Sequence, residues 1–350
     1  MSHLEERLQR DLDEIRGELA NQSVMVQIAI KHAIRAVQTR DRELAYSTVL
    51  NDHPINRHMR RIDRLCHSFI AVHLPSAGPL RQLSSAMRVN VELERIADYA
   101  VTISREALRL GSLLEGEFAH AFDQLCDQAQ LMLDQAISAF NELNAEKARS
   151  TMPLVAPVEN TLNEIYMELM HGCDNGELKQ RFALFVIFAH LKRVMDQAKN
   201  LCEETIFAVT GEQKAAKIYN ILFVSSDSRL SQIAYAVAHK NHPNTSNLIC
   251  AGSVLADLDA ETSEFLLQSG AAPSPEGAWT LSSIPAHVLA QQHVLISLDA
   301  PPENYFDEIP FHSVALLWDV TESSAAGIEE LYRDIALRMR DLMQLIRGDE

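Results

Sequence analysis

The feature that most constrains the fold of this chain is a single change of hydrophobic pattern close to residue 214. Up to about residue 211, apolar residues recur at the spacing of amphipathic helices, with few Pro or Gly interruptions. Beyond it, short apolar runs alternate with helical stretches. Because each pattern buries its own apolar faces, we predict an all-helical domain over residues 1–212 and a smaller α/β domain over residues 216–350.

Turn and cap residues divide the helical part into six expected helices. The breaks fall near residues 41, 74–79, 110–112, 150–153 and 174–176, where Asp, Pro, Gly or Ser gather. Several of these helices have roughly 30 residues, which corresponds to about 45 Å. Helices of that length with short connections usually form antiparallel bundles.

An internal repeat indicates how the bundle is organised. The segment LERIADYAVTISREAL (residues 93–108) aligns without a gap with LKRVMDQAKNLCEETI (residues 191–206), and Leu, Arg, Asp, Ala and Glu recur at matching places. The simplest architecture is two related three-helix units, residues 1–110 and 112–212, with the repeat on the third helix of each. The alternative is a chance match between amphipathic helices.

The C-terminal part contains four runs typical of buried strands. They cover residues 218–224, 246–252, 293–299 and 313–319, and helical stretches separate them. This alternation predicts a small parallel sheet with helices on both faces. We expect residues 325–347 to form the longest helix of this domain.

Charge and composition exclude several classes of protein. The net charge of −17 argues against a nucleic-acid partner, because phosphate backbones are held mainly by Lys and Arg. No apolar run approaches the length of a membrane span, and the charged N-terminus is unlike a signal peptide, so we expect a cytoplasmic protein without membrane insertion. The five cysteines are widely spaced, which signals neither a disulfide framework nor a zinc site.

The two parts differ in charge. Residues 215–350 hold 7 Lys and Arg against 18 Asp and Glu, whereas residues 1–214 hold 24 against 30. The α/β part is therefore the more acidic of the two. A protein partner or a cation suits this balance better than a polyanion does.

A pair of carboxylates on the third helix is the first candidate site. Glu94 and Asp98 stand four residues apart, so both lie on one helical face within reach of a shared cation. The alternative is a solvated face on which Arg95 or Arg88 relieves the repulsion between them.

Residues 49–100 resemble the most recognisable stretch of the PhoU family of phosphate-signalling regulators, and the likeness extends over residues 1–212. They contain an Asp-x-x-Ile-Asn start, a Pro-x-x-x-x-Leu-Arg turn and a Leu-Glu-Arg-Ile-x-Asp motif. The residues that carry these motifs are Asp52, Ile55, Asn56, Pro75, Leu80, Arg81, Leu93, Glu94, Arg95, Ile96 and Asp98.

The resemblance implies a function and a metal site. Such proteins couple a phosphate ABC transporter ATPase to a phosphate sensor histidine kinase and repress the phosphate-starvation response; a homodimer is expected. The family's E/DxxxD motifs are associated with metal ions, which transfers to Glu94 and Asp98, and to Asp196 in the second repeat. Iron, zinc, manganese and magnesium are not distinguished. Lys192 replaces the expected acid, so Asp196 is expected to pair with it, although Asn200, Glu203 and Glu204 stand nearby.

A second candidate site opens the α/β domain, where a strand, a loop and a helix follow one another. The loop residues Ser225, Ser226, Asp227, Ser228 and Arg229 precede a helix, so backbone N–H groups and a guanidinium are expected to cradle phosphate. Residues 216–347 resemble the fold of low-molecular-weight tyrosine phosphatases and arsenate reductases, whose loop begins with a nucleophilic Cys. Here Ser225 replaces that Cys and the loop is one residue shorter, so we assign no catalytic residue.

Three functions remain open on the sequence alone. The first is a regulator that acts through protein contacts. The second is a phosphatase or arsenate reductase regulated by its helical domain, with Asp319 as the general acid unless this residue only caps the last helix. The third is an in-line phosphate sensor that uses the loop at residues 225–229.

Overall fold

The computed structural model describes residues 3–155, 178–214, 217–310 and 313–348, and the single positions Val158, Leu162, Ile165, Tyr166 and Leu169 between the first two ranges. The chain forms two compact units, Met1–Lys214 and Ala215–Glu350, and each has its own hydrophobic core. The predicted break at residues 174–176 lies outside the described residues, as does most of the helix expected before it.

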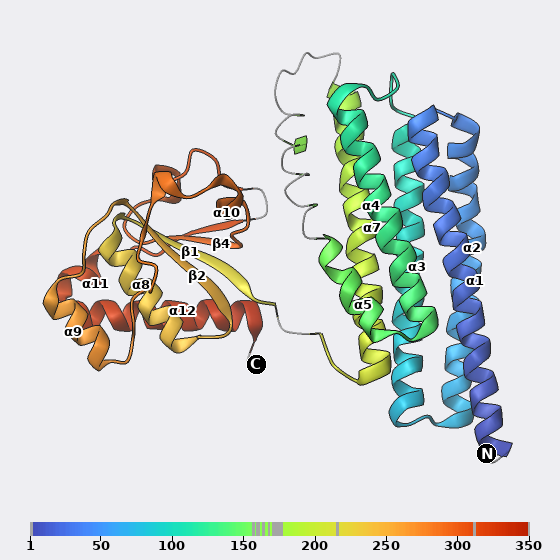
Figure 1. Ribbon diagram of the computed structural model, residues 1–350, viewed down its shortest axis with the longest axis horizontal. Coiled ribbons are helices and arrows are strands. Elements are labelled where there is room, and N and C mark those ends of the chain that lie inside the picture. Colours follow the sequence, from blue (N-terminus) through green and yellow to red (C-terminus); the bar gives the residue numbers. More distant parts are fainter. Residues whose placement is uncertain are drawn as a thin grey trace. The chain divides into compact units, whose positions relative to one another are not determined.

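Long helices build the first unit (Figure 1). The third helix, α3, packs against α1, α2 and α7, and α4 packs against α7 and α1. The two helices that carry the repeat, α3 and α7, therefore lie against each other at the centre of the unit. This confirms the predicted helical bundle. The bounds are α1 (His3–Thr39), α2 (Arg42–His73), α3 (Ala77–Ala107), α4 (Gly116–Glu142), α5 (Ala145–Thr151), η1 (Met152–Val155) and α7 (Leu178–Thr210).

The ends of these helices follow capping chemistry. Asp41 caps α2, since its Oδ1 accepts a hydrogen bond from the Leu44 backbone N at 3.0 Å. The expected single helix over residues 112–150 is wrong. Leu143 adopts a left-handed conformation with φ of 51°, and Asn144 caps a new helix by accepting from Lys147 N at 3.0 Å. This local bond ends α4 and starts α5.

The second unit is built on a five-stranded parallel sheet of order β3-β2-β1-β4-β5. This confirms the predicted parallel α/β fold. The two-residue β3 was not predicted, because so short a strand has no periodicity to detect. The bounds are β1 (Tyr219–Asp227), β2 (Ser246–Val254), β3 (Trp279–Thr280), β4 (Val294–Ser297) and β5 (Val314–Leu317).

Helices cover both faces of this sheet. On one face, Ile221 and Phe223 of β1 pack with α8 and α12; on the other, Leu222 and Val224 pack with α10 and the loops near it. The last helix begins at Ile328 rather than at residue 325, because Gly327 with φ of 117° separates it from α11. The bounds are α8 (Ser228–Asn241), α9 (Ala260–Gln268), η2 (Leu281–Ser283), α10 (Ala286–Ala290), η3 (Pro302–Asn304), α11 (Thr321–Ala326) and α12 (Ile328–Arg347).

The strand order places the loop after β1 at a switch point of the sheet. The chain passes from β1 to β2 on one side and later to β4 on the other side of β1. In open parallel sheets, ligands bind at the carboxyl ends of the strands where the order reverses in this way. The loop at residues 225–229 occupies that position.

Candidate functional sites

An acidic cluster joins α2 and α3 in the first unit. Asp52 on α2 lies near Glu94 and Asp98 on α3, and we call these three residues the acidic trio. Asn56 Nδ2 donates to Asp52 Oδ2 at 2.7 Å, which fixes that carboxylate. The other oxygen, Asp52 Oδ1, is buried without a hydrogen-bond partner. A buried unpaired carboxylate oxygen is costly and is well suited to a cation.

The trio disfavours its own charged state. Burial raises the pKa of Glu94, and Asp98 and Asp52 raise this pKa further. Burial likewise raises the pKa of Asp98, and Asp52 adds to that shift. Arg95 opposes the shift at Glu94 and Arg105 opposes it at Asp98, yet both pKa values stay raised. A bound cation would relieve this repulsion.

The fit to a metal is partial. Carboxylate oxygens are the donors that hard divalent cations prefer, and the trio supplies three carboxylates. Within the part of the chain that the structure describes, however, no three His, Cys, Asp or Glu side chains converge closely enough to hold an ion together. The charge and donor chemistry of the trio therefore suit a cation, whereas its present side-chain arrangement does not enclose one.

Glu94 and Asp98 are predictable metal candidates from their spacing on one helix, whereas Asp52 is not. Asp52 was visible in the Asp-x-x-Ile-Asn motif. Its proximity to Glu94 depends on how α2 packs against α3, which spacing along one helix does not reveal. The proposed relief by Arg88 is not what the structure shows: Arg88 Nη1 pairs with Glu204 Oε1 at 2.9 Å.

In the second repeat, a lysine stands at the position that Glu94 occupies in the first. Lys192 Nζ lies 2.9 Å from Asp196 Oδ2, which is the ion pair that the sequence led us to expect. Among the other nearby acids, Glu203 pairs with Lys214 at 2.7 Å and Glu204 pairs with Arg88 through Oε1, whereas Glu204 Oε2 is buried without a hydrogen-bond partner. Asp196 is thus paired with a lysine, whereas Asp98 has Asp52 as an acidic neighbour.

The loop at residues 225–229 is held by bonds within itself. Asp227 accepts from the backbone N of Arg229 and from its Nε, each at 2.9 Å, so a carboxylate already engages the guanidinium. Arg229 lowers the pKa of Asp227 through these bonds. Ser225 Oγ donates to the Asp227 carbonyl at 2.7 Å and accepts from Ser231 N at 3.2 Å. The Ser225 hydroxyl is therefore buried and both donates and accepts a hydrogen bond within the loop and helix start.

A second carboxylate reaches the same loop from the end of β4. Asp299 Oδ2 accepts from the backbone N of Ser226 at 2.9 Å, and Tyr305 Oη donates to the other oxygen of Asp299. The hydroxyls of Ser226 and Tyr305 lie 2.9 Å apart. Burial and the Asp299 carboxylate raise the pKa of Tyr305 to about 12. A backbone amide expected to bind phosphate is thus bound to an acidic side chain.

The start of α8 packs directly on β2. A Cβ on Gly252 would lie 2.6 Å from the backbone N of Ser228, so only glycine fits there. Ser228 Oγ accepts from Ala256 N at 2.9 Å, which ties the helix start to the segment after β2. Ser228 is therefore a structural residue of this junction.

Asp319 serves as a cap. Its Oδ1 accepts from the backbone N of Thr321 at 3.1 Å and from Thr321 Oγ1 at 2.6 Å, at the start of α11. These bonds lower the pKa of Asp319, so it stays ionised at neutral pH. These bonds lie at the short α11 and not at the last helix, α12, which Asp319 was expected to cap. A general acid would need a raised pKa, which Asp319 does not have.

These features define a class: a tandem helical domain with a carboxylate site, joined to a parallel α/β unit. The model of the PhoU domain family matches this chain twice, over residues 19–107 and 122–205. The helical unit of the chain therefore belongs to the PhoU family. The two matches correspond to the two repeats recognised in the sequence.

Known proteins agree with this assignment. A phosphate-specific transport system accessory protein PhoU homolog from Clostridium acetobutylicum is 25% identical over 206 residues, which are 58% of this chain and 94% of that protein. The crystal structure of PhoU from Pseudomonas aeruginosa has a TM-score of 0.55 and 26% identity, and covers 58% of this chain and 99% of that one.

A third similarity concerns the fold alone. A thioredoxin-dependent arsenate reductase from Corynebacterium glutamicum has a TM-score of 0.32 and 22% identity, and covers 55% of this chain and 98% of that one. The strand order of the α/β unit itself defines its fold. Among the described residues, no helix combines the length and apolar character required to cross a membrane.

Proposed function

We propose that this protein regulates phosphate uptake and the phosphate-starvation response by binding the ATPase of a phosphate ABC transporter, a phosphate sensor histidine kinase, or both. The observation that carries the proposal is the twofold PhoU match, together with relatives named as accessory proteins of phosphate-specific transport. Such a regulator would act in the cytoplasm and as a homodimer. Contacts between proteins, rather than turnover, would transmit the signal.

A gene deletion tests this role in the organism that carries the protein. A reporter driven by a phosphate-starvation promoter should become active at high phosphate in the deletion strain and be silenced again by the wild-type gene. A fragment of residues 1–214 should silence it as well if the α/β unit is dispensable. A reporter that stays silent in the deletion strain would contradict the proposal.

We further propose that the acidic trio is the metal site of this regulator. The support is the buried unpaired Asp52 Oδ1 and the mutual repulsion of the three carboxylates. Asp196 is the weaker candidate, because Lys192 already neutralises it. Elemental analysis of the purified protein should show a metal that Glu94→Ala plus Asp98→Ala removes and Asp196→Ala leaves in place. Equal metal content in all three proteins would contradict the assignment.

Phosphate sensing by the loop at residues 225–229 is a separate proposal, favoured by the exposed Arg229 at the start of α8. For phosphate to bind, Arg229 must exchange Asp227 for the anion. Calorimetric titration of phosphate should therefore show tighter binding to Asp227→Asn than to the wild type, and none to Arg229→Ala. Absence of heat in all three proteins would leave the loop a structural element.

Among the described residues, the hydrogen-bond partners of the Ser225 hydroxyl include no general base. The Ser225 hydroxyl is engaged by backbone groups, and an activated serine needs an adjacent general base. We therefore expect no hydrolysis of an aryl phosphate by the purified protein with any of the four metals considered above. Turnover that disappears in Ser225→Ala and Arg229→Ala would revive the alternative.

A further inference from the structure

The outward face of α2 carries a continuous row of exposed side chains. Successive members stand three or four residues apart, so they line one side of the helix. We call this row the α2 outer stripe: Tyr46, Leu50, His53, Arg57, Arg60 and Arg64, all of them exposed. Its first part is apolar and its last part is basic.

The three arginines of the stripe have no carboxylate partner within ion-pair distance among the residues that the structure describes. Their neighbour Arg61, which points toward α1, pairs with Glu18 at 2.9 Å. Elsewhere in the unit, Arg88 pairs with Glu204 and Arg109 with Glu106. Like charges three or four residues apart on a helix repel each other. The chain has a net charge of −17, yet among the described residues no acid forms an ion pair with this row.

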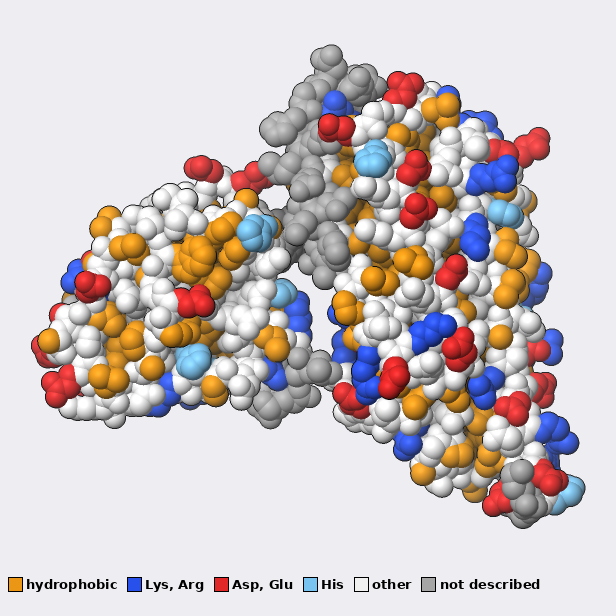
Figure 2. Space-filling view, in the orientation of Figure 1, with side chains coloured by type: hydrophobic (Ala, Val, Ile, Leu, Met, Phe, Trp, Pro, Cys, Tyr) orange, Lys and Arg blue, Asp and Glu red, His pale blue; other side chains and the backbone are white. Residues whose placement is uncertain are grey.

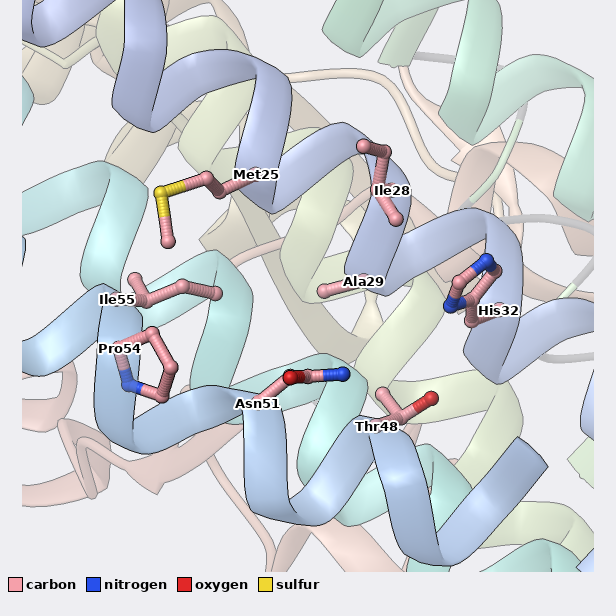
Figure 3. Close-up of a pocket in the computed structure, with 8 residues that line it drawn as sticks. All are labelled: Met25, Ile28, Ala29, His32, Thr48, Asn51, Pro54 and Ile55. Atoms are coloured by element: carbon pink, nitrogen blue, oxygen red, sulfur yellow. The ribbon is translucent and has the colours of Figure 1, made fainter. Parts of the chain in front are cut away.

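A groove lies beside the apolar end of the stripe, between α1 and α2 (Figure 3). Its volume is about 240 Å³, and Met25, Ile28, Pro54 and Ile55 supply most of its apolar lining. Ile28 on its rim is 47% exposed, and Leu50 in the stripe is 65% exposed. The groove is large enough for one apolar side chain of a partner.

We propose that the α2 outer stripe and this groove together dock an acidic amphipathic helix of a protein partner. Carboxylates of that helix would pair with Arg57, Arg60 and Arg64, and one of its apolar side chains would enter the groove. The inference rests on the proposed function and names the surface and chemistry of its partner contact. Arginine and tyrosine are the residues that protein interfaces favour.

A membrane surface fits the same face less well. The opposite side of α2 is buried in the core through Ile55, Ile62 and Phe69, so the helix cannot sink its apolar face into lipid. The groove can accommodate an apolar side chain of a protein partner, whereas a flat layer of lipid headgroups would leave it unfilled.

One face of the helical unit offers a contrast. On the face seen in Figure 2, acidic and basic side chains of the helical unit are interspersed. Such mixed surfaces are ordinary for soluble proteins. The α2 outer stripe departs from that pattern, because its three arginines follow one another along one face of α2 with no acidic residue among the members of the stripe.

The experiment measures binding of the full-length protein to the two proteins of the proposed function, the transporter ATPase and the cytoplasmic part of the sensor kinase. The test variant is Arg57→Glu plus Arg60→Glu plus Arg64→Glu. The matched control reverses three exposed arginines elsewhere, Arg10→Glu plus Arg333→Glu plus Arg340→Glu. We expect the test variant to bind at least one partner about tenfold or more weakly, and the control to bind within about twofold of wild type.

Two further measurements sharpen the result. Ile28→Asp, which places a charge in the groove, should also weaken binding, and thermal unfolding of each variant checks that it folds. If the wild type binds neither partner, the proposed function fails. If the wild type binds and the stripe variant binds equally well, the docking surface alone is overturned. Loss of binding only to vesicles that contain anionic phospholipid would also overturn it, in favour of a membrane.

Discussion

At the scale of single residues, repulsion within the acidic trio destabilises the folded protein, and a neutral substitution should remove part of that repulsion. Asp98→Asn removes one of three neighbouring charges. The free energy of unfolding of the metal-free protein should therefore rise by about 0.2–0.5 kcal/mol at pH 7. The folded-state pKa of Asp98 is raised, so this carboxyl costs stability only as pH rises above its unfolded pKa of about 3.9. The gain should therefore vanish below about pH 4.

Thermal unfolding after chelation checks this prediction, with Asp196→Asn as the matched control at the corresponding position of the second repeat. That control loses its ion pair with Lys192 and should not gain stability. Adding Mn²⁺ should reverse the order, because the wild type would then be stabilised and Asp98→Asn would not. A metal-free Asp98→Asn protein less stable than wild type at pH 7 would contradict the assignment of repulsion.

The residues of the candidate sites were predictable only in part. Glu94 and Asp98 follow from spacing on one helix, whereas Asp52 joins them through the packing of α2 on α3. The loop at residues 225–229 was recognised from its strand–loop–helix pattern. The hydrogen bond from this loop to Asp299 was not predictable. Asp299 lies about 70 positions further along the chain, and the order of the strands brings it to the loop.

At the scale of elements, the contact between β2 and α8 depends on a missing side chain. Gly252→Ala would push a Cβ to 2.6 Å from Ser228 N, a backbone atom that cannot rotate away. We expect the α/β unit to lose about 1–3 kcal/mol, measured by urea unfolding. As a control, Gly17→Ala in α1 meets nothing within 4 Å and should stabilise the helical unit by about 0.5–1 kcal/mol. An unchanged transition of the α/β unit would disprove the clash.

Capping decides where the long helices of the first unit stop. Asn144→Ala removes the acceptor for Lys147 N, so the free energy of unfolding of the helical unit should fall by about 0.5–2 kcal/mol in the same urea experiment.

Hydrophobic periodicity predicted most helices and four of the five strands. It missed the break at Leu143 and the strand Trp279–Thr280, because a single left-handed residue and a two-residue strand leave no periodic signal.

At the scale of the whole molecule, the two units have separate cores that share no residue. A fragment of residues 1–214 should therefore unfold cooperatively on its own, with a midpoint close to that of the helical unit in the full chain. A fragment of residues 1–110 should not, because α3 would lose its packing against α7 within the same core. Circular dichroism during heating distinguishes the two, and a gradual, uncooperative transition of the longer fragment would contradict the prediction.

The ion pair of Lys192 with Asp196 has a consequence for stoichiometry. A chain with two copies of one domain invites the expectation of two equivalent cation sites. In the second copy, however, the counter-ion is an ammonium group covalently attached to the protein, 2.9 Å from the carboxylate. A chelator cannot remove this ammonium group, and the metal concentration around the protein does not change it. Only the first half of the tandem would then respond to the ionic composition around it, with one equivalent of metal per chain instead of two.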